Sequence, residues 1–226
     1  MAIDRQTIID TLRQGWAKVG TSPILSSVWA YAGLEPWPYD PPAAAEILRQ
    51  HGWQRGADGI LTRDGVRFSF TLATDAASRS WRDTAAMIQD QLLLIGIEVL
   101  IQPMELNTLL ARLGEHDFDA TMGSWGIDTS LDLKYAFHTD SIDGGYNFGG
   151  YSDPRVDELI DEAKRQLEPR DAGPLLREIQ EILHRDQPYT FLWEPQRIAA
   201  MAVRLRDARP NSVSTYQNLR AWWIAE

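Results

Sequence analysis

The chain has 226 residues, a formal net charge of −10, 44% hydrophobic residues and 24% charged residues. This length and composition are typical of one large globular domain, or of one domain with extensions, and not of a disordered segment. The acidic balance repels phosphate backbones and anionic lipid, so nucleic-acid binding is not expected, and the absence of cysteine excludes disulfides and thiolate metal sites.

The four histidines are scattered and show none of the spacings typical of a metal site, so neither a metal nor a cofactor is predicted. No segment approaches the roughly 18 apolar residues that a membrane-spanning helix needs. The first residues, 1–5, lack the basic start, apolar stretch and cleavage site of a signal peptide. We therefore expect either a cytoplasmic protein or a chain whose true beginning is missing.

The first part of the chain predicts two helices, a hairpin and a strand. Apolar periodicity predicts a helix over residues 4–14, and the aromatic-rich segment 15–39 is irregular but too apolar to be a free linker. Asp40 caps a second helix, which Gly52 ends. Two Asp-Gly dipeptides then predict a short hairpin, and residues 66–73 alternate as one half-buried strand.

Strands and helices alternate through the middle of the chain. The predicted elements, in order, are a helix over 80–95, a strand over 97–101 that Pro103 stops, a helix over 106–113 and a strand over 117–124. This order predicts an α/β fold in which a mixed sheet is flanked by helices. Later in the chain, helices are expected over 153–167 and 171–184, and two strands near a hairpin over 189–193 and 198–203.

Residues 125–152 have no periodicity and are rich in glycine and aspartate, so we expect a long loop of the kind that is usually functional or disordered. The loop begins just past the carboxyl end of a predicted strand, where ligands bind in open α/β sheets. Trp125 could stack on an apolar group there, and Asp128 could pair with an ammonium or hydroxyl group. In the alternative interpretation, Trp125 belongs to the core and Asp128 caps a turn.

Asp117 and Asp119 lie two residues apart in a predicted strand and therefore point to the same face. With His116 beside them, they suggest acid–base catalysis or a metal site. The alternative is a solvated start of the strand.

The run 144–151 is rich in glycine and aromatic residues. It resembles no phosphate-binding loop, because no Lys-Ser or Lys-Thr pair follows it. Tyr146, Asn147 and Tyr151 either face a ligand or only pin the loop.

Both ends of the chain are rich in tryptophan. The tryptophans in these peripheral segments are Trp16, Trp29, Trp37, Trp222 and Trp223. Exposed together, they would form a sticky patch. They therefore suggest a missing partner surface or a contact between the subunits of a homo-oligomer.

An ordered set of short motifs resembles one known family. Tyr39-Asp40-Pro41 precedes an alanine-rich helix with Ile47-Leu48, and Gly52-Trp53 follows. The further matches, in chain order, are Ala2-Ile3-Asp4-Arg5 before these motifs and, after them, Arg82, Ala85, Ile88, Gln89, Leu92, Gly96-Ile97-Glu98-Val99, Asp117-Phe118-Asp119-Ala120, Gly123-Ser124-Trp125, Asn147, Tyr151, Asp157, Arg170, Leu176, Gln180 and Pro188. The set covers nearly all of the chain and is similar to the family 5 extracellular solute-binding proteins of ABC transporters, which include periplasmic dipeptide-, oligopeptide- and nickel-binding proteins.

The resemblance implies a periplasmic binding protein-like lobe that performs no catalysis. Such a lobe captures a peptide or similar small solute for delivery to an ABC transporter permease. In peptide-binding relatives, an aspartate soon after the strand-end tryptophan pairs with the amino terminus of the ligand, which indicates Asp128 and, as a second candidate, Asp132. In nickel- and metallophore-binding relatives a Trp-Gly pair lines the pocket, and Trp125-Gly126 fits that role.

This chain departs from the family pattern after Asp128. The family often has Asp-Pro-Asp where this chain has Ser130-Leu131-Asp132. Binding of nickel, a metallophore or an oligosaccharide therefore stays open as an alternative, as does a hydrolase that uses paired carboxylates among Asp117, Asp119 and Asp128.

The resemblance also implies a division of the chain. Family members are much longer, with a signal peptide and an N-terminal lobe before the matching part. We expect a hinge-proximal segment over 1–39, a C-terminal α/β lobe over 40–195 and, over 196–226, a segment that returns toward the missing lobe. The full-length parent would be periplasmic or extracellular. The predicted ligand-binding residues are Trp125, Asp128, Asp132, Asn147 and Tyr151.

Overall fold

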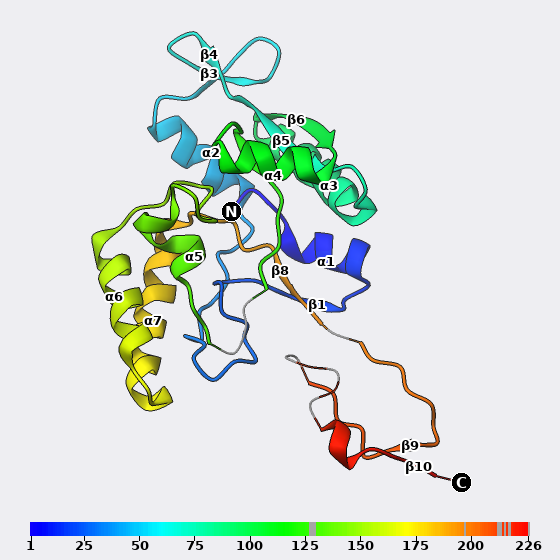
Figure 1. Ribbon diagram of the computed structural model, residues 1–226. Coiled ribbons are helices and arrows are strands. Elements are labelled where there is room, and N and C mark those ends of the chain that lie inside the picture. Colours follow the sequence, from blue (N-terminus) through cyan, green and yellow to red (C-terminus); the bar gives the residue numbers. More distant parts are fainter. Residues whose placement is uncertain (127–129, 197, 212–213, 215, 217, 226) are drawn as a thin grey trace.

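The computed structural model describes residues 1–226 except 127–129, 197, 212–213, 215, 217 and 226. The predicted ligand residue Asp128 lies outside the described residues. Figure 1 shows a layered α/β part in its upper half, a pair of long helices at the lower left and an extended carboxyl-terminal segment at the lower right.

The α/β part is built on a three-stranded parallel sheet with the strand order β6-β5-β7. The bounds are β5 Ser69–Asp75, β6 Glu98–Met104, β7 Ala120–Thr121, helix α3 Arg79–Leu94 and helix α4 Leu106–Gly114. Because side chains alternate across a strand, Leu72 packs in the core that α3 covers, whereas Ala73 packs against Leu109 of α4 on the other face. The predicted α/β fold with crossover helices is confirmed, and β5 and β6 lie beside α3 and α4 in Figure 1.

Three details of the strands differ from the prediction, and the first is that β7 covers only Ala120–Thr121 of the expected 117–124. Residues 66–73 form two strands, because β4 (Val66–Arg67) belongs to a separate antiparallel sheet and Val66 is 64% exposed. Pro103 lies inside β6 rather than ending it. Strand β6 is at the edge of its sheet, where the missing N–H of a proline removes no ladder bond on the open side.

The amino-terminal elements follow the predicted caps and turns. They are helix α1 Arg5–Arg13, helix α2 Pro41–Gln50, strand β2 Gln54–Arg55 and strand β3 Leu61–Arg63. The side chain of Asp40 accepts a hydrogen bond from the backbone N–H of Ala43, as an N-cap does. Between β3 and β4, Asp64 and Gly65 have φ values of 54° and 78°, the left-handed pair that a tight two-residue hairpin requires.

The second half of the chain forms a helical part. Its elements are α5 Lys134–Phe137, the 3₁₀ helix η1 Thr139–Ser141, α6 Pro154–Arg165 and α7 Pro169–Asp186. Phe137, Leu159 and Leu183 are buried in its core, together with Ile24 and Ala30 from the irregular segment near the amino terminus. That segment packs as expected. The prediction of a structureless loop over 125–152 is wrong, because α5 and η1 form within it and bury apolar side chains.

The predicted pair of strands near the end of the chain is also wrong. Strand β8 (Trp193–Pro195) pairs antiparallel with β1 (Ala17–Val19), so it joins two distant segments, and residues 198–203 form no strand. The last elements are β9 Leu205–Arg206, η2 Leu219–Ala221 and β10 Trp223–Ile224, and β9 pairs with β10.

Within the part of the chain that the structure describes, no helix combines the length and the apolar character needed to cross a membrane. The division at residues 39 and 195 stays a prediction.

Candidate functional site

The carboxyl end of β7 carries the strongest candidate site. The backbone N–H of Met122 donates to the carbonyl of Ala73 at 3.2 Å, so the chain follows the sheet up to this point. Trp125 comes three residues later and is 38% exposed. Since β5 and β7 are parallel, Trp125 follows the edge at which ligands bind in open α/β sheets.

Trp125 is part of an aromatic cluster that joins distant segments. We define the aromatic cluster as Trp125, Tyr135, Tyr146 and Phe148. The ring of Trp125 lies 5.5 Å from Tyr135, 6.2 Å from Tyr146 and 6.0 Å from Phe148, measured between centroids. Tyr146 is 56% exposed, and its ring also contacts Tyr135 and Phe148 at 6.4 and 5.8 Å. The cluster therefore presents a partly open aromatic surface, suited to stacking on apolar or planar groups of a ligand.

Tyr135 and Phe148 were not among the predicted ligand-binding residues. Tyr135 lies on α5, a helix that the sequence pattern did not predict, and Phe148 packs against the buried side chains of Ala73, Leu109 and Leu113. The aromatic content of the glycine-rich run 144–151 was the only signal that could have identified Phe148.

Asn147 lies in the loop between the two ring-bearing positions Tyr146 and Phe148, and its side chain is fully buried. Its amide nitrogen donates to the carbonyls of His138 and Tyr151 at 3.1 and 2.7 Å, and its amide oxygen accepts from the N–H of Tyr151 at 3.1 Å. These three bonds fit the interpretation in which Asn147 pins the loop. A ligand contact for Asn147 stays a prediction.

Tyr151 is anchored on the helical part. Its hydroxyl donates to a carboxylate oxygen of Asp186 at 2.9 Å. Burial of the phenol, and next this bond to Asp186, raise the pKa of Tyr151 well above its usual range. The described contacts of Tyr151 thus hold the end of the loop against α7, and its predicted ligand contact is likewise untested.

Asp132 anchors the other end of the segment that contains Asp128. One of its carboxylate oxygens lies 2.7 Å from Nζ of Lys164 on α6, and the other accepts from the backbone N–H of Lys134 at 3.0 Å. The preceding residue, Leu131, is buried although its φ of 52° is rare for leucine. Burial of Leu131 and the Asp132–Lys164 ion pair thus fix the chain directly after the residues that the structure does not describe. Asp132 as a ligand residue stays a prediction.

Lys134 and Asp161 tie α5, the helix that carries Tyr135, to α6. Nζ of Lys134 lies 3.1 Å from a carboxylate oxygen of Asp161 and 3.3 Å from one of Asp140. The hydrogen bond to Lys134 lowers the pKa of Asp161, and the same bond raises the pKa of Lys134. This ion pair holds the helix that carries Tyr135.

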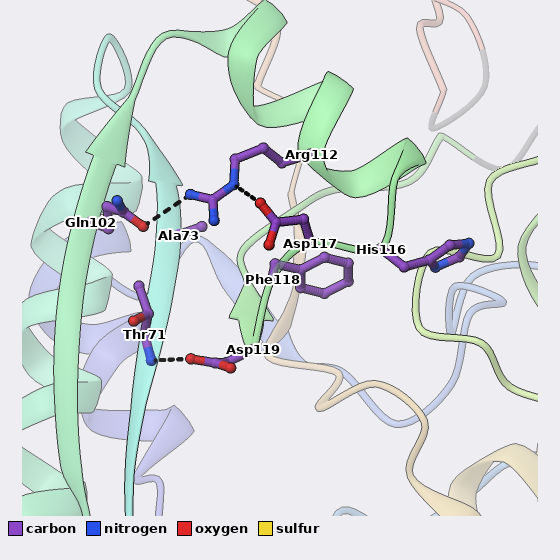
Figure 2. A pocket seen from close by; sticks show the side chains of 8 residues that line it. All are labelled: Thr71, Ala73, Gln102, Arg112, His116, Asp117, Phe118 and Asp119. Atoms are coloured by element: carbon purple, nitrogen blue, oxygen red, sulfur yellow. Dashed lines mark hydrogen bonds and ion pairs between the residues drawn. The ribbon is translucent and has the colours of Figure 1, made fainter.

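The amino-terminal side of β7 carries a polar pocket of about 300 Å³. Figure 2 shows the guanidinium of Arg112 between Asp117 and Gln102, at 2.8 and 3.3 Å. The carboxylate of Asp119 accepts a hydrogen bond from the backbone N–H of Thr71 at 2.8 Å. Each carboxylate thus has a partner within the chain, and both residues are exposed, which fits the interpretation of a solvated start of the strand.

His116 also lines this pocket, but Figure 2 shows its ring directed away from Arg112 and Asp117. Among the residues that the structure describes, no group of three or more histidine, aspartate or glutamate side chains is placed to hold a metal ion. The polar pocket therefore offers less to a ligand than the aromatic cluster does.

Comparisons with known proteins identify relatives of this chain. Residues 1–147, more than half of the chain, match the family described as "Bacterial extracellular solute-binding proteins, family 5 Middle". The chain is 31% identical to the oligopeptide-binding protein AppA of Bacillus subtilis, with 100% of this chain and 42% of AppA covered. It is 33% identical to protein XP55 of Streptomyces lividans, with 90% of this chain and 38% of XP55 covered.

Solved structures show the same fold. AppA of B. subtilis in complex with a nonapeptide superposes with a TM-score of 0.85 at 32% identity, covering 100% of this chain and 46% of AppA. NikZ from Campylobacter jejuni in complex with Ni(L-His) has a TM-score of 0.82 at 20% identity, with 98% of this chain and 46% of NikZ covered. The chain spans less than half the length of each of these proteins. From the extent of the family match, this chain belongs to the bacterial extracellular solute-binding proteins of family 5.

Proposed function

We propose that this chain forms one wall of the ligand site in the substrate-binding component of an ABC importer, and that the ligand is a peptide or a similar small solute. The observation that carries the proposal is the partly open aromatic cluster at the carboxyl edge of the sheet, in a chain that belongs to a family of solute-binding proteins. Such a protein acts by binding and not by catalysis, so the proposal includes no enzymatic step.

The arrangement of side chains supports binding over chemistry. Around Trp125 the described groups are rings held in edge and stacked contacts, which give a ligand apolar surface and stacking partners. The carboxylates of Asp117 and Asp119, which a hydrolase could use, lie in the polar pocket, each bonded within the chain. The alternative of a hydrolase with paired carboxylates is therefore the weaker one.

A single wall leaves much of a ligand exposed to solvent. Binding proteins commonly enclose a ligand between two lobes that close about a hinge. The matched relatives are more than twice as long as the part that this chain covers, so they contain enough chain for a second wall. In this proposal residues 40–195 form the lobe, residues 1–39 lie near the hinge, and residues 196–226 run toward the second wall.

Peptides are the favoured ligand class. AppA, whose name describes an oligopeptide-binding protein, is 31% identical to this chain, whereas NikZ, solved with Ni(L-His), is 20% identical. The second candidate, a nickel chelate, is kept because Trp125-Gly126 fits that class as well and Ser130-Leu131-Asp132 departs from the Asp-Pro-Asp pattern. An ABC permease would be the partner, and the word "extracellular" in the family description supports a parent protein that works outside the cytoplasm.

Calorimetric titration of the chain with peptides of several lengths, with Ni(L-His) and with an oligosaccharide tests the proposal. We expect heat of binding with a peptide, and affinity about tenfold lower in a Trp125→Ala variant, because a large aromatic contact is lost. Trp16→Ala is the matched control, since Trp16 is also exposed but lies outside the aromatic cluster. Binding of Ni(L-His) alone would favour the second candidate. Equal loss in both variants, or no binding of any of the three classes, would count against the site.

A further inference from the structure

His116 makes two contacts that the proposed binding site does not use. It lies in the turn between α4 and β7, with a φ of 56°, and its side chain is exposed. Its Nδ1 lies 3.0 Å from the carbonyl oxygen of Phe148, and its Nε2 lies 3.2 Å from the carbonyl oxygen of Ile142. One imidazole thus bridges two points of the loop that carries Tyr146.

The chemistry of these two contacts selects one protonation state. A carbonyl oxygen can only accept a hydrogen bond, and a neutral imidazole has a single N–H, so it can satisfy only one of the two carbonyls. The other ring nitrogen would then turn its lone pair toward an oxygen lone pair. The imidazolium form has an N–H on both nitrogens and satisfies Ile142 and Phe148 together.

The two carbonyls belong to the segment that shapes the aromatic cluster. Phe148 stacks on Trp125 with an interplanar angle of 24°, and Tyr146 contacts both rings edge-on. His116 therefore fixes the loop 142–148 against the turn from which β7 runs to Trp125. Loss of one of the two hydrogen bonds of His116 frees one point of the loop and loosens the rings of Tyr146 and Phe148, which the loop carries.

Charged groups lie on both elements that the imidazole joins. On its own side of the polar pocket lie Asp117, Asp119 and Arg112, and the charge of Arg112 is matched by its ion pair with Asp117. On the loop side Asp143 follows Ile142 directly, and Asp140 begins the same segment with Lys134 beside it.

We propose that His116 is a positioning residue whose protonated imidazole holds the aromatic cluster in its ligand-binding arrangement. The loop is held at both points when the imidazole carries two protons, and at one point after the pH rises through its titration. Ligand affinity therefore falls as the pH rises through that range. The effect on ligand affinity rests on the proposed function, whereas the anchoring of the loop does not.

The anchoring is tested by NMR on the isotope-labelled chain, titrated between about pH 5 and 8, where histidine charge changes are normally seen. The ¹⁵N shifts of the His116 ring report whether both nitrogens are protonated, and the ring signals of Tyr146 and Phe148 report the cluster. We expect these ring signals to titrate with the same midpoint as His116. In His116→Asn, whose side chain tolerates the left-handed φ but does not titrate, that coupled change should vanish.

His51→Asn is the matched control, because His51 is exposed on the surface and one of its ring nitrogens contacts the carbonyl of Ile47. The coupled change should persist in this variant. A His116 ring that stays neutral down to pH 5 overturns the proposal, as do ring signals of Tyr146 and Phe148 that titrate unchanged in His116→Asn.

Peptide titrations at the two ends of this pH range separate the proposal from the proposed function. The wild-type chain should bind about fivefold more weakly at the higher pH, as expected for one lost hydrogen bond, and His116→Asn should show no such change. If no peptide binds at either pH but the rings still titrate with His116, the peptide function fails and the anchoring stands. If peptide binds equally at both pH values, the role of His116 in affinity is wrong.

Discussion

The two ends of β7 carry different side chains, charged groups at one end and aromatic rings at the other, and these have different roles. On the amino-terminal side, charged groups are matched within the chain, with Arg112 on Asp117 and the N–H of Thr71 on Asp119. On the carboxyl side, Trp125 and Tyr146 contact each other but keep much of their surface open to solvent. A matched ion pair gains little from a new partner, whereas exposed aromatic surface gains by being covered. The contrast locates binding at the aromatic end and structural support at the charged end.

The aromatic end depends on the buried side chain of Asn147 in its own loop, and the largest expected effect follows from removing this side chain. Asn147→Ala leaves the carbonyl of His138 and the N–H and carbonyl of Tyr151 without their side-chain partner. Because the bond to His138 is buried and the two bonds to Tyr151 are partly buried, we expect a loss of about 2–3 kcal/mol in the free energy of unfolding. Urea denaturation measures this loss, and binding should weaken as well, since the loop carries Tyr146 and Phe148.

The control for that variant is Asn107→Ala, at an exposed position of α4. It should change the free energy of unfolding by less than about 0.5 kcal/mol, as surface substitutions usually do. A loss of similar size in the two variants would show that Asn147 has no special role in holding the loop.

Substitutions at the charged end should have little effect on stability and none on peptide affinity. The double variant Asp117→Asn and Asp119→Asn removes both negative charges but keeps side-chain oxygens that can accept hydrogen bonds. We expect the free energy of unfolding to fall by no more than about 1 kcal/mol, because the pair between Arg112 and Asp117 is partly exposed. Calorimetric affinity for peptide should be unchanged. A strong loss of affinity in this variant would move the ligand site to the polar pocket and remove the contrast between the two ends.

The features of these two ends that the sequence predicted are those that depend on interactions between residues close together in the chain. The long helices were predicted because caps such as Asp40 and Asp153 and the apolar spacing act within a few residues. A strand before Trp125 was predicted from another local pattern, the alternation of apolar residues, although β7 ends at Thr121 rather than at residue 124. Strand β7 is much shorter than expected, because the side chain of Asp119 meets the N–H of Thr71 where another ladder bond could have formed.

The parts that the sequence did not predict rest on contacts between distant residues. The pairing of β1 with β8 joins segments about 175 residues apart, and no local pattern predicts such a partner. The bridge from His116 to Ile142 and Phe148 is of the same kind, since its acceptors are backbone carbonyls that leave no trace in the residue type. The sequence pattern therefore indicated Trp125 and Tyr146 but not the bonds that bring their rings together.

The smallest expected effect concerns the pH dependence that the ion pair between Lys134 and Asp161 gives to stability. The hydrogen bond from Lys134 lowers the pKa of Asp161 in the folded chain below its value in the unfolded chain. The unfolded state then binds more protons in acid, so the stabilisation is present above the unfolded pKa of about 4 and is lost as the pH falls through the lower folded value. Thermal unfolding followed by circular dichroism between about pH 2 and 6 should show a less steep acid loss in Asp161→Asn than in the wild type.

Asp90→Asn, at an exposed position of α3, is the matched control and should keep the acid dependence of the wild type. Because the side chain of Asp161 is 40% exposed, water and salt partly screen its pair with Lys134, and the difference should shrink further when salt is added. An acid dependence that is identical in Asp161→Asn and the wild type would mean that α5, and with it Tyr135, is held by apolar packing alone. The aromatic end would then owe its order to Phe137 and its buried neighbours, and the charges around it would be as dispensable as those at the other end of β7.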